Sequence, residues 1–214
     1  MNIQKSLYSL ILFTAIICIN CISNLQAQPT VKIGTQIWMA RNLNVDKFRN
    51  GENIPQANTD EEWKKAGINK QAAWCYYNND PANGAKYGKL YNWYAVNDPR
   101  GLAPVGWHVI SWTGFQTFFT PFLPEAAGKL KQVGTLNWKT PNTGATNESG
   151  FTGLPGGFRS ANGFFNLGEV GKWWASSGEN DSNVWSFDLI YLNGRLNIAS
   201  CNEELGLSVR CLKD

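Results

Sequence analysis

The sequence contains one histidine among its 214 residues, and only 16% of the residues are charged. A non-haem iron site built from two histidines and a carboxylate is therefore excluded within one chain. A hydrolase with a Ser–His–Asp triad would need His108 as its base, yet the chain has no Gly-x-Ser-x-Gly sequence. His108 follows Trp107 in a predicted strand, which favours a structural, hydrogen-bonded histidine.

Long apolar runs are absent after the first 27 residues, and the formal net charge of +3 is small. A charge so near zero gives no reason to expect nucleic acid or an anionic membrane as a partner. The start of the chain carries Lys5, an apolar run over 7–19 and a cleavage-type sequence ending at Ala27. This pattern predicts a signal peptide over 1–27 and an exported chain over 28–214, with no transmembrane segment after cleavage.

The destination of the exported chain is left open by the N-terminal pattern. A secreted, periplasmic or cell-surface location fits removal of the signal peptide. A lipoprotein anchored through Cys21 is the alternative, although the preceding Ile19-Asn20 fits poorly with the small residues that this processing requires. The remaining chain over 28–214 has the length of one domain.

Cysteine is scarce after the predicted cleavage point, where Cys75, Cys201 and Cys211 remain. Export permits a disulfide, and three cysteines allow three different single bridges. The segment between Cys201 and Cys211 has the pattern of a turn between two strands, which would bring these two sulfurs together. Cys75 lies in an apolar segment, 72–77, that is typical of a buried free thiol.

Aromatic residues and turn formers are abundant by contrast, with ten tryptophans and 21 glycines. Aromatic side chains bury a large area each, so most of them are expected in the core, and any exposed tryptophan would offer a binding platform. The pattern predicts an α+β fold with short helices, small antiparallel sheets and long ordered loops. The expected elements are a hairpin over 31–39, a helix over 59–67, a turn cluster over 78–84, a helix or strand over 87–96, a strand over 106–110, a helix over 115–122 with Thr113 and Gln116 as caps, and strands over 173–177, 184–189 and 207–211.

Six ordered motifs resemble one known family, the Fibrobacter succinogenes major paralogous domain. They cover nearly all of the exported chain and lie at 33–44, 87–95, 104–109, 146–159, 173–177 and 209–211. The resemblance implies an exported, often surface-associated bacterial domain of unassigned activity, with a compact fold distantly similar to C-type lectins and formylglycine-generating enzymes. Fold similarity of this kind does not settle function.

The sequence departs from the family pattern at two places. Ala103 stands where the family commonly has a cysteine, so a bridge from that position to Cys211 is impossible and Cys201 becomes the expected partner. The family also tends to continue with a proline and a helix start that combines an acidic residue with tryptophan, whereas the segment 110–116 of this chain has Trp112 but neither the proline nor the acid. Any site that uses this acid would be missing here.

Two loops are rich in oxygen ligands, namely 78–83 and 179–183, the second of them near Asp188. Carboxylate and amide oxygens suit calcium, although these residues are also ordinary turn formers, and no other cofactor is indicated. We expect an exported noncatalytic binding domain for carbohydrate or a cell-surface protein. The expected ligand-binding residues are Trp173, Trp174, Trp185 and Asp181. The alternatives are a structural cell-surface protein and a hydrolytic enzyme.

Overall fold

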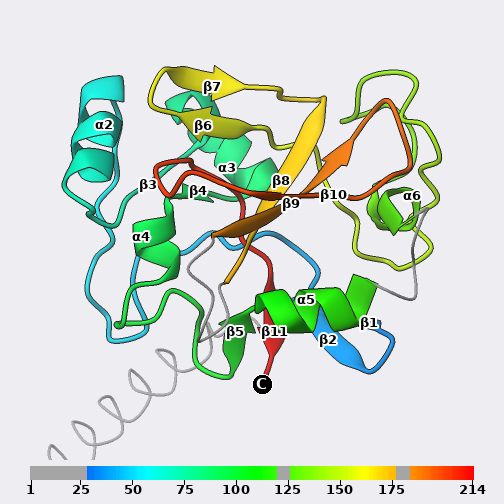
Figure 1. Ribbon diagram of the computed structural model, residues 1–214, viewed down its shortest axis with the longest axis horizontal. Helices are drawn as coiled ribbons and strands as arrows, with labels where there is room; N and C mark the ends of the chain where they lie inside the picture. The colour runs from blue at the N-terminus through cyan, green and yellow to red at the C-terminus, as the bar shows by residue number, and fades with distance from the viewer. Residues whose placement is uncertain (1–27, 120–125, 177–183) are drawn as a thin grey trace, which may run out of the picture.

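The computed structural model describes residues 28–119, 126–176 and 184–214 and confirms the α+β class. The helices are short and the strands form small sheets (Figure 1). The helical elements are α2 (Asp60–Ile68), η1 (Tyr77–Asn79), α3 (Pro81–Tyr87), α4 (Trp93–Val96), α5 (Trp112–Phe119) and α6 (Ala126–Leu130). The strands are β1 (Thr30–Ile33), β2 (Gln36–Met39), β3 (Trp74–Cys75), β4 (Leu90–Tyr91), β5 (Trp107–Val109), β6 (Phe158–Ser160), β7 (Gly163–Phe165), β8 (Val170–Ala175), β9 (Trp185–Ile190), β10 (Asn197–Ser200) and β11 (Cys211–Lys213).

The strands of each sheet pair antiparallel. One sheet has the order β1-β2-β11-β5 and another the order β10-β9-β8, while β3-β4 and β6-β7 form two-stranded ribbons. The C-terminal strand β11 therefore lies between the opening hairpin and β5, with Leu212 opposite both Trp38 and His108. Figure 1 shows β8 and β9 crossing the middle of the molecule, between this four-stranded sheet and the β6–β7 hairpin.

Strand β8 connects two hydrophobic clusters because successive side chains of a strand point to opposite faces. Trp173 packs in a cluster with Phe151 and Phe187, whereas Trp174 packs in the other cluster beside Trp93. Both β8 tryptophans are fully buried. At about 25 cal/mol per Å² of apolar surface and 150–250 Å² for each aromatic side chain, such residues dominate the stability of the core.

Local sequence signals account for several elements. The 31–39 segment forms the expected β1–β2 hairpin, whose turn contains Gly34 at a φ of +60°. Helix α2 begins with the expected capping box, because the Thr59 side chain accepts from the Glu62 amide and the Glu62 side chain accepts from the Thr59 amide. The phenylalanine stripe is also confirmed where it is described, since Phe115 and Phe119 of α5 are buried. Phe122 lies outside the described residues.

Three predictions about local structure were wrong. The turn cluster over 78–84 contains the start of helix α3, because Asp80 caps it by accepting from the Ala82 amide and Pro81 occupies the first helical position. The 87–96 segment is neither one helix nor one strand but is divided between β4 and α4. Helix α5 begins at Trp112, with the Ser111 hydroxyl accepting from the Gly114 amide, so Thr113 lies inside the helix and is not its cap.

The expected disulfide between Cys201 and Cys211 is not formed. Cys211 lies in β11 of the four-stranded sheet, whereas Cys201 follows β10 of the three-stranded sheet, so no shared ladder brings the sulfurs together. Cys201 Sγ lies 2.8 Å from Ser186 Oγ instead. Within the described ranges all three cysteines are free, and Cys75 is buried as expected.

A membrane-spanning helix is not found in the described part of the chain, where every helix is too short or too polar for that role.

Candidate functional site

The aromatic platform expected on β8 does not exist. Trp173 stacks on Phe187 at a centroid distance of 5.3 Å and donates from Nε1 to Asn42 Oδ1 at 2.8 Å. Trp174 donates from Nε1 to the Tyr91 carbonyl at 2.7 Å. Both indoles are 0% exposed, so neither offers a face to a ligand. The expectation for these two residues is corrected, because β8 is covered on both faces.

Trp185 is only partly buried and stacks on Trp112, with ring centroids 4.4 Å apart and an interplanar angle of 10°. Its part in ligand binding stays a prediction. Asp181 lies outside the described residues, as does the whole loop 179–183. Asp188, the carboxylate expected near that loop, instead forms a 2.7 Å ion pair with Lys172 on the neighbouring strand β8.

The other oxygen-rich loop uses its side chains for local structure. Asp80 caps α3, Asn79 Nδ2 donates to the Asn58 carbonyl, and Asn83 Nδ2 donates to the Tyr77 carbonyl. Over the described ranges, no three residues among His, Cys, Asp and Glu come together as a metal site. Calcium binding by the second loop therefore stays a prediction.

His108 lies on β5, as the sequence indicates, and its Nδ1 is 2.7 Å from Asp214 Oδ1. Both side chains are about half exposed. The hydrogen-bonded arrangement expected for this histidine is present, with the C-terminal residue as its partner.

A polar cavity of about 550 Å³ lies between α2 and the segments that precede and follow it. Its walls carry the amide side chains of Asn53, Gln56 and Gln71 and the ammonium groups of Lys65 and Lys70. Neither lysine takes part in an ion pair within the described ranges. None of the described residues that line this cavity is aromatic, so its ligand contacts would be made mainly through hydrogen bonds.

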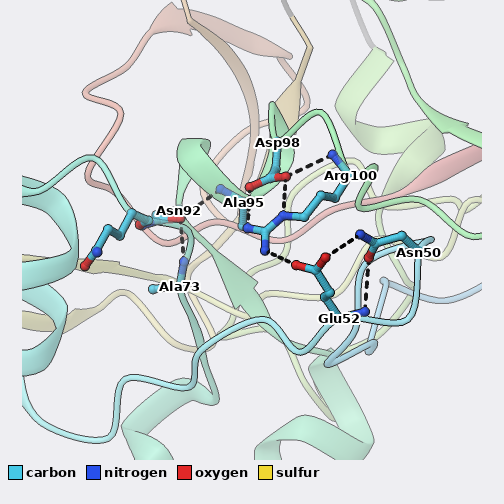
Figure 2. A network of polar contacts seen from close by, with 8 residues as sticks. Asn50, Glu52, Ala73, Asn92, Ala95, Asp98 and Arg100 are labelled. Carbon is cyan, nitrogen blue, oxygen red and sulfur yellow. Dashed lines mark hydrogen bonds and ion pairs between the residues drawn. The ribbon is translucent and has the colours of Figure 1, made fainter.

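Arg100 forms the charged edge of this cavity and is held by two carboxylates. Its Nε and Nη2 donate to Asp98 at 2.8 Å, and its Nη1 donates to Glu52 at 2.7 Å (Figure 2). The guanidinium also lies 4.1 Å from the centre of the Phe48 ring. Hydrogen bonds from Arg100 hold the pKa of Asp98 below its usual value. Asn50 donates to the second oxygen of Glu52, which extends the network.

The wall formed by residues 71–73 is fixed from behind by Asn92. Its Oδ1 accepts from the Ala73 and Ala95 amides (Figure 2). Its Nδ2 donates to the Gln71 carbonyl. Asn92 is buried and is the N-cap of α4. One amide group thus ties the cavity wall to a helix, so the wall is held in place before any ligand arrives.

Sequence reasoning did not find this cavity. Its charged residues Asp98 and Arg100 flank Pro99, a pattern typical of a turn, while Glu52 is 48 positions away from Arg100. The available signal was the clustering of Asn53, Gln56 and Gln71 around the predicted α2 helix. Amides in loops are too common for this signal to stand out.

A model of one protein family, described as the Fibrobacter succinogenes major domain, matches residues 31–213. No curated protein and no solved structure matches the chain. The similarity to C-type lectins expected from the sequence therefore stays a prediction.

Proposed function

The chain belongs to the Fibrobacter succinogenes major domain family, and from this premise and the site geometry we propose that it is an exported, noncatalytic carbohydrate-binding domain. The observation that carries the proposal is the cavity of about 550 Å³ lined by amides and ammonium groups. Its volume lies within the usual range for small-molecule sites. Amide and ammonium groups are suited to the closely spaced hydroxyls of a sugar, which both donate and accept hydrogen bonds.

The two carboxylates on this cavity are already engaged, which favours binding over catalysis. Glu62 Oε2 accepts from the amides of Asn58 and Thr59 at the start of α2. Asp98 is paired with Arg100 and has a lowered pKa, so it is a poor proton donor at neutral pH. A glycoside hydrolase needs one carboxyl group with a raised pKa to protonate the leaving group. The pKa of Asp98 is lowered, which is the opposite of this requirement.

A glycan array probed with the purified protein, with calcium and again with chelator, tests the proposal. We expect binding in both conditions, since no cluster of metal-ligating residues is found on this cavity in the described part of the chain. Gln71→Ala and Lys65→Ala should each weaken binding by about tenfold, the equivalent of one good hydrogen bond. Lys64→Ala is the matched control, because Lys64 is exposed on the same helix but does not line the cavity.

The pattern of failure would show which part of the proposal is wrong. Binding that needs calcium would move the site to the loop over 179–183. Binding that survives both cavity substitutions would favour the surface near Trp185. An array without any signal would contradict the carbohydrate proposal.

A second candidate function is attachment to a cell-surface protein. The segment after α6 exposes Val133 and Leu136 at 54% and 89%. Exposed apolar side chains of this size are favourable contacts for a protein partner. Val133→Ser combined with Leu136→Ser should abolish attachment of the protein to intact cells while leaving the glycan array unchanged.

Export itself rests on the N-terminal pattern of the sequence, which lies outside the described residues. Expression in a bacterial host followed by N-terminal sequencing of the exported protein tests it. We expect the mature chain to begin at Gln28.

A further inference from the structure

A second hollow lies on a different part of the surface, between the segment that follows β2 and helix α3. It consists of two cavities of about 290 and 300 Å³. Both are lined by Arg41, Asn42, Ala85 and Lys86, so they are two parts of one cleft. We call it the cationic cleft.

The charges on the cationic cleft have one sign. Arg41 and Lys86 are exposed on its two sides, and Arg210 lines the second cavity. None of the described residues that line either cavity is an aspartate or a glutamate. Within the described ranges, no ion pair involves any of the three cations. Like charges that converge on a concave surface produce a local positive potential.

Arg210 is the unusual member of the set because it is 2% exposed and its hydrogen-bond acceptors are all neutral. Nε and Nη2 donate to Asn42 Oδ1 at 3.0 and 2.8 Å, and Nη1 donates to the carbonyls of Met39 and Phe151 at 3.1 and 2.9 Å. These four hydrogen bonds occupy four of the five guanidinium donors. Buried charges are normally paired, and this one has no counter-charge among the described residues.

The cleft is rigid around Asn42. The Asn42 side chain also accepts from Trp173 Nε1 and donates from Nδ2 to the Tyr87 carbonyl at 2.8 Å. Gly88 follows at a φ of +78°, and a Cβ at this position would lie 2.8 Å from the Leu43 carbonyl oxygen. The two walls are therefore in close backbone contact, which only glycine permits here.

We propose that the cationic cleft binds an oxyanion, namely a carboxylate, sulfate or phosphate group of the ligand. Arg41 and Lys86 contact the anion from the two sides, and Arg210 supplies the buried positive charge beneath it. Charge-assisted hydrogen bonds of this kind are stronger than those between neutral groups. The site is separate from the carbohydrate cavity and does not depend on the function proposed for that cavity.

An NMR titration of the purified protein tests this assignment. Sodium sulfate, sodium phosphate and sodium acetate are added separately, with chloride adjusted to keep the ionic strength constant. We expect saturable shifts of the backbone amides over 41–44 and 85–88. The double variant Arg41→Gln/Lys86→Gln should weaken binding at least about tenfold, since two charged donors are lost.

The control is Arg195→Gln/Lys64→Gln, which removes the same charge from two exposed residues outside the cleft. It should bind the anions as the unmodified protein does. The anion with the lowest Kd identifies the chemical source of the group. The proposal is overturned if the 41–44 and 85–88 amides show no saturable shifts, or if both double variants bind equally well. Because the probes are inorganic ions and acetate, this failure is distinguishable from failure of the carbohydrate proposal.

Discussion

Arg100 and Arg210 line different hollows and are held in opposite ways. Arg100 is partly exposed and has two carboxylates within 2.8 Å. Arg210 is buried and is surrounded by an amide oxygen and two backbone carbonyls. The exposed cation is therefore neutralised inside the protein, whereas the buried one is not.

This difference indicates the kind of ligand that each hollow suits. Arg100 is already neutralised, so the carbohydrate cavity gains little from an anion at that position, and its cations without an ion pair in the described ranges are the exposed side chains of Lys65 and Lys70. The cationic cleft has positive charge without a counter-charge among the described residues, so an anion would improve its electrostatic balance. The two hollows could then engage different groups of one polymer or two separate ligands.

The largest effect on the free energy of unfolding is expected when the two arginines are replaced one at a time. Arg210→Met leaves the Met39 and Phe151 carbonyls without their donor and should lower the free energy of unfolding by about 3 kcal/mol. Arg100→Met removes exposed ion pairs, and its effect should be clearly smaller. Urea denaturation at neutral pH measures both variants. Equal losses would contradict the contrast between the two sites.

Lys131 extends the comparison to a second buried cation. Its Nζ donates to the carbonyls of Thr143, Ile190 and Asn193, and burial lowers its pKa from 10.5 to about 8. Lys131→Met should cost about 3 kcal/mol at pH 7, because three buried carbonyls lose their donor.

The lowered pKa of Lys131 also fixes the sign of a pH effect. Between about pH 8 and 10.5 the unfolded chain binds a proton at Lys131 that the folded protein has lost. The stability of the unmodified protein relative to Lys131→Met should therefore rise with pH in this window and be constant below it. Urea denaturation of both proteins from pH 7 to 10 measures this stability difference. If the unmodified protein loses stability relative to Lys131→Met as the pH rises, the assigned pKa is wrong.

Asn42→Asp would make the Arg210 site resemble the Arg100 site. A carboxylate in this position would neutralise Arg210 from within, so sulfate affinity in the cationic cleft should fall by about tenfold. The NMR titration described above measures it, with Asn44→Asp as a control that adds the same charge at the cleft rim. If both variants lose the same affinity, the effect comes from net charge and not from Arg210.

Asp98→Asn removes one of the two carboxylates that hold Arg100, and its effect on stability should be the smallest. Hydrogen bonds from Arg100 lower the pKa of Asp98 below 3.8, so this carboxylate stabilises the folded protein above that pH. The contribution is lost as the pH falls below 3.8. The stability difference between the unmodified protein and Asp98→Asn should thus shrink on acidification, as followed by urea denaturation at pH 6 and pH 3.

The parts of the fold that were predicted from the sequence depend on neighbouring residues. The α2 capping box, the β1–β2 hairpin and the phenylalanine stripe of α5 each lie within about ten positions, so their patterns are visible in one window. The burial of Trp173 and Trp174 depends on what covers each face of β8. Their covering partners Asn42 and Tyr91 lie 131 and 83 positions away, and no local pattern reveals them.

Three of the family motifs contribute residues to the cationic cleft, which the sequence alone does not reveal. Asn42, Gly88 and Arg210 belong to three separate motifs, and the structure brings all three to the cationic cleft. Their residue types, an amide, a glycine and an arginine, have ordinary structural explanations when each is considered alone. Only the joint arrangement shows a buried cation without a counter-charge.

The free thiols have a consequence for the surroundings in which the domain can operate. The described residues contain no covalent cross-link, and burial raises the pKa of Cys75 and Cys211 to about 11 and about 12. These two sulfurs stay protonated and shielded at neutral pH, which makes them poor nucleophiles towards oxidants. Oxidising and reducing conditions should hence leave these two buried thiols and the core around them unchanged, whereas Cys201, which is partly exposed, is the thiol that an oxidant can reach.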